Sequence, residues 1–390
     1  MKKVAIGLTI APFQVLRCST IFLLFLRSLP VLLIFGTHTM KRRFLAIVIT
    51  FLAFSGLSAQ IGGSTAFVSL DLPMSARMAA LGGKSCGIND NDLNLAIWNP
   101  ALLREDMSSQ LALSFADYFS DIKYGYAGGA WHLKNVGTFS LYTTRIDYGT
   151  FRETDESGNT LGEFTAGEYG INVGYARAID SNLTVGANLK YMQSNLYLWN
   201  SNAIAADLAL NYNLPAKNFS MSFMLRNIGF VMKQYTQGND EKLPFEIEGG
   251  FSFKPQHMPF RFSLGLQHLE RWDLTYTDPN NPPQLVDPLT GDSIKVSKFK
   301  TWGDKLARHM IFGGEILIGK SFSIRMGYNY QRRKELLVDT RRGMTGFSFG
   351  VGFRVYKFHL SYAHARYHIA GGTNTFTVTA TLSQFYRKKS

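Results

Sequence analysis

The chain has 390 residues, of which 46% are hydrophobic, 14% aromatic and 18% charged, and this composition excludes a disordered or low-complexity protein. Its 36 glycines, 30 phenylalanines and 18 tyrosines, set against 12 prolines, are typical of a strand-rich aromatic protein. The formal net charge of +13 is partly local, because residues 1–59 hold seven basic side chains and no acidic one. Subtracting those seven from the 41 basic side chains leaves 34 against 28 acidic ones, an excess that gives nucleic-acid binding little support.

Residues 40–59 have the three parts of a secretory signal peptide. Positions 40–43 include three basic residues, positions 44–54 are apolar, and small residues follow up to Ala59, the expected cleavage position. Export would leave Cys86 as the remaining cysteine, which excludes an intrachain disulfide and a metal site built from several cysteines.

Residues 1–39 precede this signal and hold a second apolar stretch. Arg27 and Pro30 interrupt that stretch, so it is shorter than the ~20 apolar residues that a membrane-spanning helix needs. We interpret this segment as an over-called start or an extra targeting segment, with a helical anchor as the alternative.

From residue 60 onward, large apolar residues alternate with small or polar ones. The segments 183–191, 322–331, 347–355 and 375–383 show this period of two, which predicts strands with one apolar and one polar face. Phe349 falls on an apolar face and Ser348 on the polar face of the same strand. If the apolar faces meet lipid, arginine at Phe349 is expected to cost roughly 2–4 kcal/mol at mid-membrane, and the same change at Ser348 is expected to be mild.

Fourteen strands are predicted from this pattern. Their ranges are 110–117, 123–133, 136–147, 166–179, 182–197, 203–213, 219–228, 243–254, 260–269, 307–319, 322–331, 344–356, 357–366 and 374–385. Short connections alternate with mostly longer ones, which are 148–165, 198–202, 229–242, 270–306 and 332–343. A soluble sandwich has no reason to sort its loops in this way, whereas short turns at one end and long loops at the other are typical of outer-membrane barrels. The predicted fold class is therefore all-β, a transmembrane antiparallel β-barrel of about 14 strands.

The barrel is predicted at 110–386, with a basic tail at 387–390. Residues 60–109 do not alternate, and we expect them to fold into the lumen as a plug. An even number of strands places both ends on one side, so the termini are expected in the periplasm and the long loops outside the cell. Polar and basic residues are expected to point into the lumen, among them Lys190, Arg325, Asn329 and Arg354.

The plug segment holds Arg77, the pair Gly82-Gly83, an acidic turn at 90–92 and the tripeptide at 99–101. Together with the strands that follow, this pattern resembles the FadL-type outer-membrane barrels. Within them it is most similar to the PorV/PorQ branch of the type IX secretion system, and the compact length favours the PorQ group. The residues that carry the resemblance are Arg77, Gly82, Gly83, Asn99, Pro100 and Ala101.

This resemblance implies a non-catalytic outer-membrane component without a cofactor. Its extracellular loops would hold a surface protein resembling PorZ in an attachment complex with PorU and PorV, which links secreted cargo to lipopolysaccharide. The alternative is a FadL-like transporter of hydrophobic small molecules. A transporter needs an apolar cavity between plug and wall, and the polar residues expected in the lumen slightly disfavour that alternative.

Four motifs that could carry chemistry have simpler explanations. The Gly-x-Ser-x-Gly pattern at 346–350 lies within an alternating strand and not at a strand-to-helix elbow. The Ser-x-x-Lys at 120–123 lacks the Lys-Thr-Gly that accompanies it in penicillin-binding enzymes. His364 and His368 have helical zinc spacing but lie on a predicted strand, and the calcium-loop start at 90–94 fails at its later positions. We therefore predict no enzyme and no metal site.

Two loops are the candidates for binding at the surface. The loop 270–306 holds Trp272, Tyr276 and Trp302 near its ends, and long loops on rigid barrels commonly bind partners. The second loop carries a basic cluster for lipopolysaccharide phosphates or an acidic partner, made of Arg332, Arg333, Lys334, Arg341 and Arg342.

Overall fold

The computed structural model describes residues 65–236, 238, 240–275, 297–319, 321–336, 343–368 and 371–386. The expected segments at 1–39 and 40–59 lie outside the described residues, as do Tyr276, Arg341, Arg342 and the tail at 387–390. In the described ranges, no helix is long and apolar enough to cross a membrane.

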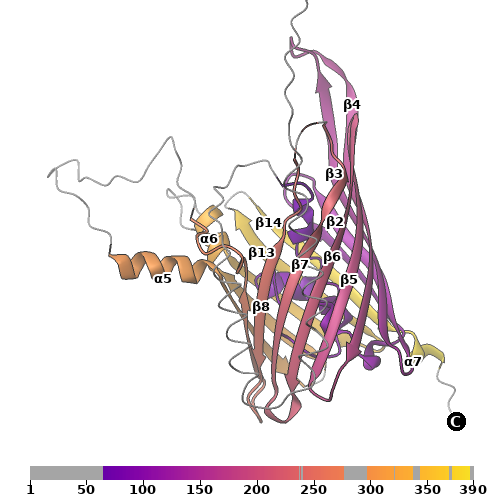
Figure 1. Cartoon of the computed structure of the whole chain (residues 1–390), viewed down its shortest axis with the longest axis vertical. Helices are drawn as coiled ribbons and strands as arrows, with labels where there is room; N and C mark the ends of the chain where they lie inside the picture. The colour runs from indigo at the N-terminus through magenta and orange to yellow at the C-terminus, as the bar shows by residue number, and fades with distance from the viewer. Residues whose placement is uncertain are drawn as a thin grey trace, which may run out of the picture. The chain divides into compact units, whose positions relative to one another are not determined.

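Fourteen antiparallel strands form one closed barrel (Figure 1). Consecutive strands are paired, and β1 closes the barrel against β14 with Gln110 opposite Thr381. The strands are β1 Gln110–Asp117, β2 Lys123–Leu133, β3 Gly137–Thr154, β4 Thr160–Ala178, β5 Leu183–Leu196, β6 Trp199–Leu214, β7 Phe219–Lys233, β8 Glu246–Phe253, β9 Phe260–Leu266, β10 Met310–Ile318, β11 Phe322–Asn329, β12 Phe347–Val355, β13 Phe358–His368 and β14 Gly371–Thr381. The predicted fold class, an all-β barrel of fourteen strands, is confirmed.

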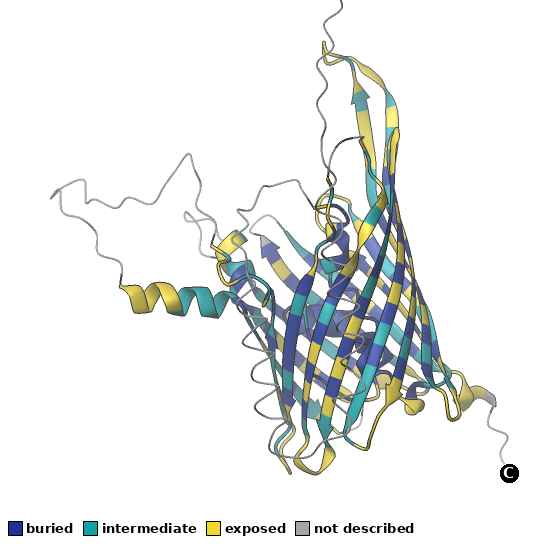
Figure 2. Ribbon diagram, in the orientation of Figure 1, coloured by how far each residue is buried: buried dark blue, intermediate teal, exposed yellow. Residues whose placement is uncertain are grey.

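Most strands alternate between a buried inner and a more exposed outer side chain, as the banding in Figure 2 shows. In β1, Ser114 is buried whereas Leu113 is 59% exposed. In β12, Ser348 is fully buried whereas Phe349 is 40% exposed. The exterior is thus apolar and the interior rich in Ser, Thr and Asn, which is the arrangement of a barrel that meets lipid with its outer surface. The architecture is that of an outer-membrane protein.

The two ends of the barrel differ in their connections. At one end, which we call the short-turn end, residues 356–357 join β12 to β13, and the helix α7 (Ser383–Tyr386) follows β14. At the opposite, long-loop end, two expected loops are in fact tight hairpins. The strands β3 and β4 leave only 155–159 between them, where the Asp155 carboxylate accepts backbone hydrogen bonds, and β5 and β6 leave only 197–198.

The wall of the barrel is much taller on one side. Strands β3 to β7 have 14–19 residues, and the β3–β4 hairpin rises beyond its neighbours in Figure 1. Strands β8 to β12 have only 7–9 residues. A strand that crosses a bilayer needs ~9–11 residues, so the short side reaches little beyond the membrane.

Two helices lie where strand ends and loops were predicted. The helix α5 (Lys298–Arg308) replaces the end of the loop 270–306, and α6 (Tyr330–Leu336) begins inside the predicted strand 322–331. Both segments are rich in Lys, Arg and Leu, which favour helices. In α5, an ion pair joins Asp304 to Arg308 one turn later, with 2.8 Å between Oδ2 and Nε.

Residues 65–109 lie inside the barrel as a plug of short helices, drawn in indigo in Figure 1. These helices are η2 Val68–Asp71, α3 Ala76–Ala80, α4 Leu93–Ala96, η3 Pro100–Leu102 and η4 Glu105–Met107. Polar side chains cap their N-termini: Ser75 caps α3, Asp92 caps α4 and Asn99 caps η3. Helices this short depend on packing against the wall for their stability.

Because the lumen is packed, the expectation of a mild effect at Ser348 is wrong. The Ser348 hydroxyl donates to the Ala80 carbonyl oxygen of the plug at 2.9 Å, so an arginine there would collide with α3. Arg354 has the same parity as the inward-facing Ser348, but it is not among the buried residues of the lumen, because it lies exposed close to the short-turn end, opposite His359. Lys190, Arg325 and Asn329 are buried in the lumen.

Candidate functional site

A cluster of buried charges joins the plug to the wall. The Arg77 guanidinium of α3 contacts Asp90 at 2.7 Å, Asp92 at 2.9 Å and Glu315 of β10 at 2.8 Å. Burial alone would lower the pKa of Arg77, but the three carboxylates outweigh it and hold the pKa above its ordinary value. Burial would raise the pKa of Asp90, yet the Arg77 and Arg261 charges hold it well below its usual range.

Two further arginines of the wall complete this cluster. Arg261 of β9 contacts Asp90 at 2.6 Å and Glu315 at 2.9 Å, and Arg325 of β11 contacts Glu315 at 3.0 Å. Three arginines thus face three carboxylates, so the buried charges are balanced. We call this group the Arg77 cluster; its members are Arg77, Asp90, Asp92, Arg261, Glu315 and Arg325.

A second group of buried charges lies nearby on β7 and β8, and we call it the Arg226 cluster. The plug residue Lys84 pairs with Glu246, and Arg226 contacts Glu248 at 3.0 Å. The Arg226 guanidinium also lies 3.4 Å from the centroid of the Trp98 ring, whose Nε1 donates to Glu248 at 2.8 Å. Its members are Lys84, Trp98, Arg226, Glu246 and Glu248.

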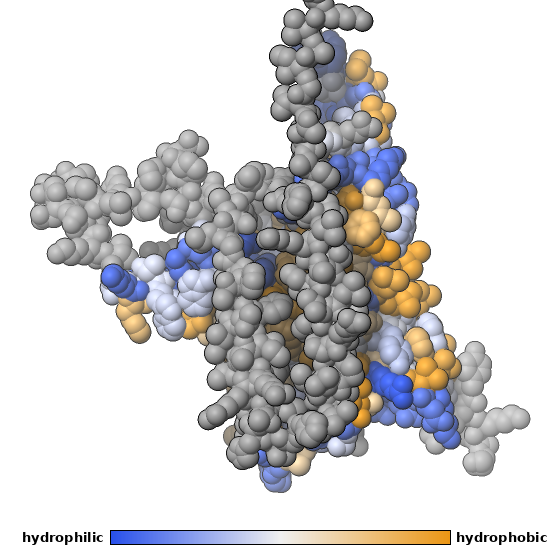
Figure 3. Space-filling model, viewed as in Figure 1, coloured by the Kyte–Doolittle hydropathy of each residue, from blue (hydrophilic) through white to orange (hydrophobic). Residues whose placement is uncertain are grey.

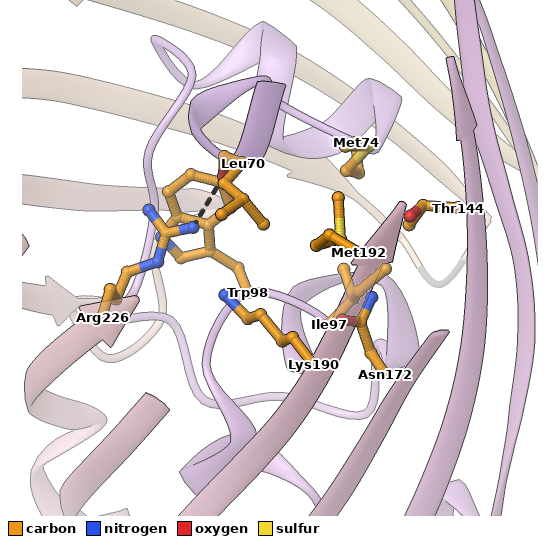
Figure 4. Close-up of a pocket in the computed structure, with 9 residues that line it drawn as sticks. All are labelled: Leu70, Met74, Ile97, Trp98, Thr144, Asn172, Lys190, Met192 and Arg226. Atoms are coloured by element: carbon orange, nitrogen blue, oxygen red, sulfur yellow. Dashed lines mark hydrogen bonds between the residues drawn. The ribbon is translucent and has the colours of Figure 1, made fainter. Parts of the chain in front are cut away.

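A small cavity lies beside the Arg226 cluster, between the plug and the inner face of β3–β7 (Figure 4). Its lining residues are Leu70, Met74, Ile97 and Trp98 from the plug and Thr144, Asn172, Lys190, Met192 and Arg226 from the wall. In Figure 4, Arg226 spans one edge and donates to the Leu70 carbonyl oxygen at 2.9 Å. The cavity volume of about 30 Å³ is room for one or two water molecules.

The wall next to the cavity carries a β-bulge. Between β6 and β7 the register shifts, so that Arg226 and Asn227 together oppose Asp207. Asn227 has a left-handed backbone (φ 56°), and its N–H donates to the Asp207 carboxylate at 2.9 Å. The buried Lys190 ammonium contacts Asp207 at 2.7 Å and donates to the Asn227 side chain at 2.9 Å. The bulge therefore places Arg226 at the cavity edge and turns Asn227 toward Asp207 and Lys190.

The residues that carry the family resemblance have clear structural roles. Gly82 and Gly83 both have φ near 100°, and a Cβ atom on either would approach Ile311 or Arg332 to 2.5 Å. The Asn99 side chain accepts from the Ala101 N–H and donates to the Cys86 carbonyl oxygen at 2.7 Å. A Cβ on Gly186 of β5 would lie 2.3 Å from the Ala101 nitrogen, so η3 packs directly on the wall.

A buried carboxylate, Glu168 of β4, lies outside both clusters. It accepts hydrogen bonds from the hydroxyls of Ser69, Tyr148 and Ser194, the last at 3.5 Å. Among the described residues it has no cationic partner within ion-pair distance. Glu168 is not among the residues predicted from the sequence, although a glutamate at an inward strand position is a signal that could have identified it.

Only some of the residues that were predicted to bind partners or lipopolysaccharide at the surface lie close to one another. The rings of Trp272 and Trp302 lie 6.2 Å apart. The Arg332 guanidinium lies over the Tyr367 ring at 4.2 Å and beside Gly83, so it faces the plug and not the solvent. Arg333 donates to the carbonyl oxygens of Gly343 and Thr345, and Lys334 contacts Asp304 at 3.4 Å. The three described members of the basic cluster are thus engaged within the chain.

Side chains of the motifs that were considered as possible catalytic or metal-binding sites form contacts within the protein. Ser348 is buried against α3, and the His364 ring nitrogen Nδ1 lies 2.9 Å from the Asn374 side chain. Asp90 and Asp92 bind Arg77. Within the described ranges, no group of three or more His, Cys, Asp or Glu side chains is arranged to hold a metal ion.

No protein-family model and no curated protein matches this sequence. Among solved structures, the Ralstonia pickettii toluene transporter TbuX is 11% identical, with a TM-score of 0.45 over 80% of this chain and 97% of that one. The Pseudomonas putida toluene transporter TodX is 11% identical, with a TM-score of 0.45 over 79% and 96%. A Pseudomonas aeruginosa FadL homologue is 10% identical, with a TM-score of 0.44 over 79% and 98%. None of these three is named as a secretion component, so membership of the PorV/PorQ branch stays a prediction.

Proposed function

We propose that this protein is an outer-membrane barrel that admits small hydrophobic molecules along the space between its plug and the β3–β7 wall. The observation that carries the proposal is the cavity at that interface. Five of its nine lining residues are apolar: Leu70, Met74, Ile97, Trp98 and Met192. Pockets for apolar ligands combine such a lining with a few polar groups, which Thr144, Asn172, Lys190 and Arg226 supply here.

The cavity is too small for an organic molecule in the conformation described, so passage requires side chains to move. Met74 and Met192 line it from opposite sides, the first from the plug and the second from the wall. Methionine side chains are unbranched and polarizable, and they repack around ligands more readily than branched residues do. We infer that these two side chains open the space while the ion pairs of the plug remain in place. The long-loop end would then face outward and receive the ligand.

The test is the uptake of the apolar dye N-phenylnaphthylamine by intact cells that express the full chain. Met192→Trp fills the cavity and is expected to slow uptake at least about tenfold. Met192→Ala enlarges the cavity and is expected to speed it. The matched control is Tyr191→Trp, because Tyr191 is the neighbouring residue on β5 and its side chain is on the outer face. Equal uptake by Met192→Trp and Tyr191→Trp, at equal barrel levels in the membrane, would overturn the proposal.

A second candidate is the role implied by the family resemblance, a platform in a type IX attachment complex. The observation that favours it is the β3–β4 hairpin, which rises beyond the rest of the wall at the long-loop end (Figure 1). Such a projecting hairpin could hold a surface protein resembling PorZ, next to PorU and PorV, and the predicted contacts at Trp272 and Trp302 lie at the same end. In this case a gentle detergent pull-down should recover a stoichiometric surface protein, and shortening the hairpin at 150–164 should release it. A chain that purifies alone would contradict this role.

A further inference from the structure

The helix α5 lies outside the barrel, where α6 contacts one side of it and the segment 272–273 contacts Trp302 and Lys305. None of its eleven residues is buried, and Phe299 and Trp302 are 81% and 51% exposed. In Figure 1 it runs sideways, away from the wall, at the long-loop end of β10. An exposed helix with large apolar side chains indicates a surface that meets something other than water.

The two faces of α5 differ sharply. With 100° between successive residues, Phe299, Trp302 and Leu306 share one face. On another face, Asp304 accepts a hydrogen bond from the Tyr330 hydroxyl of α6 at 2.6 Å, and it contacts Arg308 and Lys334. The polar face of α5 is therefore bound to α6. Because this contact fixes the rotation of the helix about its axis, it also fixes the direction in which the apolar face points.

That direction is along the barrel wall, toward the membrane. In Figure 1, α6 lies on the side of α5 that is farther from the short-turn end, so the face held by α6 points away from the membrane. Figure 3 shows hydrophobic atoms on the lower edge of α5 and hydrophilic atoms on its upper edge. The hydrophobic edge of α5 is therefore the edge nearer the short-turn end of the barrel.

The height of α5 matches the surface of the bilayer. It is connected to the short side of the wall, where β8, β9, β10 and β11 have 8, 7, 9 and 8 residues. Strands of this length barely cross the hydrocarbon core, which needs ~9–11 residues. The ends of these strands, and the helix that begins there, are therefore placed at the level of the lipid headgroups.

The free charges of α5 are positive. Lys305 is paired with Asp273 at 2.6 Å, and Arg308 with Asp304 at 2.8 Å. Among the described residues, Lys298 and Lys300 have no ion-pair partner, and both are exposed. Two unpaired ammonium groups beside a Phe and a Trp match the phosphates and acyl chains of a lipid surface.

We propose that α5 is an interfacial anchor that lies in the lipid leaflet at the long-loop end and binds phosphorylated lipid headgroups. Phe299, Trp302 and Leu306 enter the acyl boundary, while Lys298 and Lys300 meet the phosphates. This inference rests on the membrane placement of the barrel but not on the ligand of the cavity, so the two proposals can fail separately. The rival occupant, a protein partner, is an outcome of the test below.

The test uses the full chain in lipid nanodiscs, in a Cys18→Ser background where Cys86 is buried. An environment-sensitive fluorophore is placed at Phe299→Cys or, as the matched control on the opposite face, at Thr301→Cys, which is exposed. We expect the label at 299 to be quenched by brominated lipids and shielded from iodide, and the label at 301 to behave in the opposite way. Adding phosphatidylglycerol to phosphatidylcholine nanodiscs should increase the shielding at 299, and Lys298→Gln should weaken that increase by about fivefold.

Two results would overturn the proposal. One is equal quenching of both labels by iodide in nanodiscs of either composition, which would mean that α5 stands in water. The other is shielding at 299 in native outer-membrane vesicles but not in nanodiscs, which would assign the face to a protein partner. Loss of dye uptake through the cavity would leave these measurements unchanged.

Discussion

The plug meets the barrel wall on two faces that are built differently. Toward β10–β13, Arg77 is ion-paired with Glu315, and a Cβ on Gly327 would lie 2.2 Å from the Gly82 nitrogen. Toward β3–β7, the plug and wall are separated by a cavity that Met74 and Met192 line. Both faces have direct backbone contact, the second where η3 meets Gly186, but only the second also contains a cavity lined by flexible side chains.

This difference indicates how one face of the plug can be held rigidly to the wall while side chains on the other face change conformation. Ion pairs and backbone contacts have narrow geometry, so small displacements cost them much of their stabilisation. Methionines can exchange rotamers at little cost. On the proposal above, the face toward β10–β13 would act as the fixed attachment, and side-chain movement would be concentrated at the cavity.

The largest expected effect comes from removing the attachment at its centre. Arg77→Ala leaves the carboxylates of Asp90, Asp92 and Glu315 without their main partner and should destabilise the fold by about 3–5 kcal/mol. Urea unfolding in detergent micelles measures this change. The control is Arg104→Ala, since the Arg104–Asp106 pair is exposed and worth ~1 kcal/mol or less. Similar losses for both variants would mean that the Arg77 cluster does not hold the plug.

The next effect tests whether the lumen at the attached face is packed. Phe349→Arg places a charge in lipid and should cost about 2–4 kcal/mol. Ser348→Arg must displace α3 and should cost a comparable amount, roughly 1–3 kcal/mol or more. Ser348→Ala, which removes only the hydrogen bond to Ala80, serves as the control. Unfolding of Ser348→Arg like the parent would show a lumen with free space at this point.

A smaller effect distinguishes backbone contact from open space. Gly327→Ala brings a methyl group against Gly82 and should cost about 1–3 kcal/mol through overpacking. Gly314→Ala, on the adjacent strand β10, meets nothing within 4 Å and should be close to neutral. The comparison of their urea midpoints tests the attached face alone. Equal midpoints would argue that the plug can shift to make room.

The smallest effect is a pH dependence of the attachment. The pKa of Asp90 is lower in the folded protein than in the unfolded chain, where it is about 4. Its stabilising contribution is therefore complete above that pH and is lost as the pH falls through the folded value. The parent should lose more stability than Asp90→Asn between about pH 4 and about pH 2, and the difference between the two should stay constant between about pH 7 and about pH 5. Parallel unfolding curves at all pH values would exclude Asp90 as the titrating group.

The sequence was sufficient for the barrel because its pattern is local. A period of two is visible in each strand, and it predicted the outward side of Phe349 and the inward side of Lys190 and Arg325. The hairpin at β3–β4 was missed because its few large apolar residues, Phe151, Leu161 and Phe164, are separated by polar and glycine residues and show no continuous period of two. Arg354 was expected within the lumen but is exposed near its end. The period-two pattern shows which face of a strand a residue lies on, but not how far along the barrel axis it lies.

The candidate site was much less accessible from the sequence. Arg77 and the acidic turn at 90–92 were noticed as a motif, but their partner Glu315 lies more than two hundred residues away in the chain. Inward charges at Arg226 and Glu248 could have been flagged, because a charge in a strand needs a buried partner. The cavity itself depends on how side chains from five elements meet, and no local pattern encodes it.

The contacts of the plug with the end of the chain also bear on when it can dock. The plug helix α3 packs against β11, β12, β13 and β14, the last strands to be synthesised. These contacts join residues that are more than two hundred positions apart, so they form only after nearly the whole chain has been made. During synthesis, α3 therefore stays without these partners until the C-terminal strands are in place.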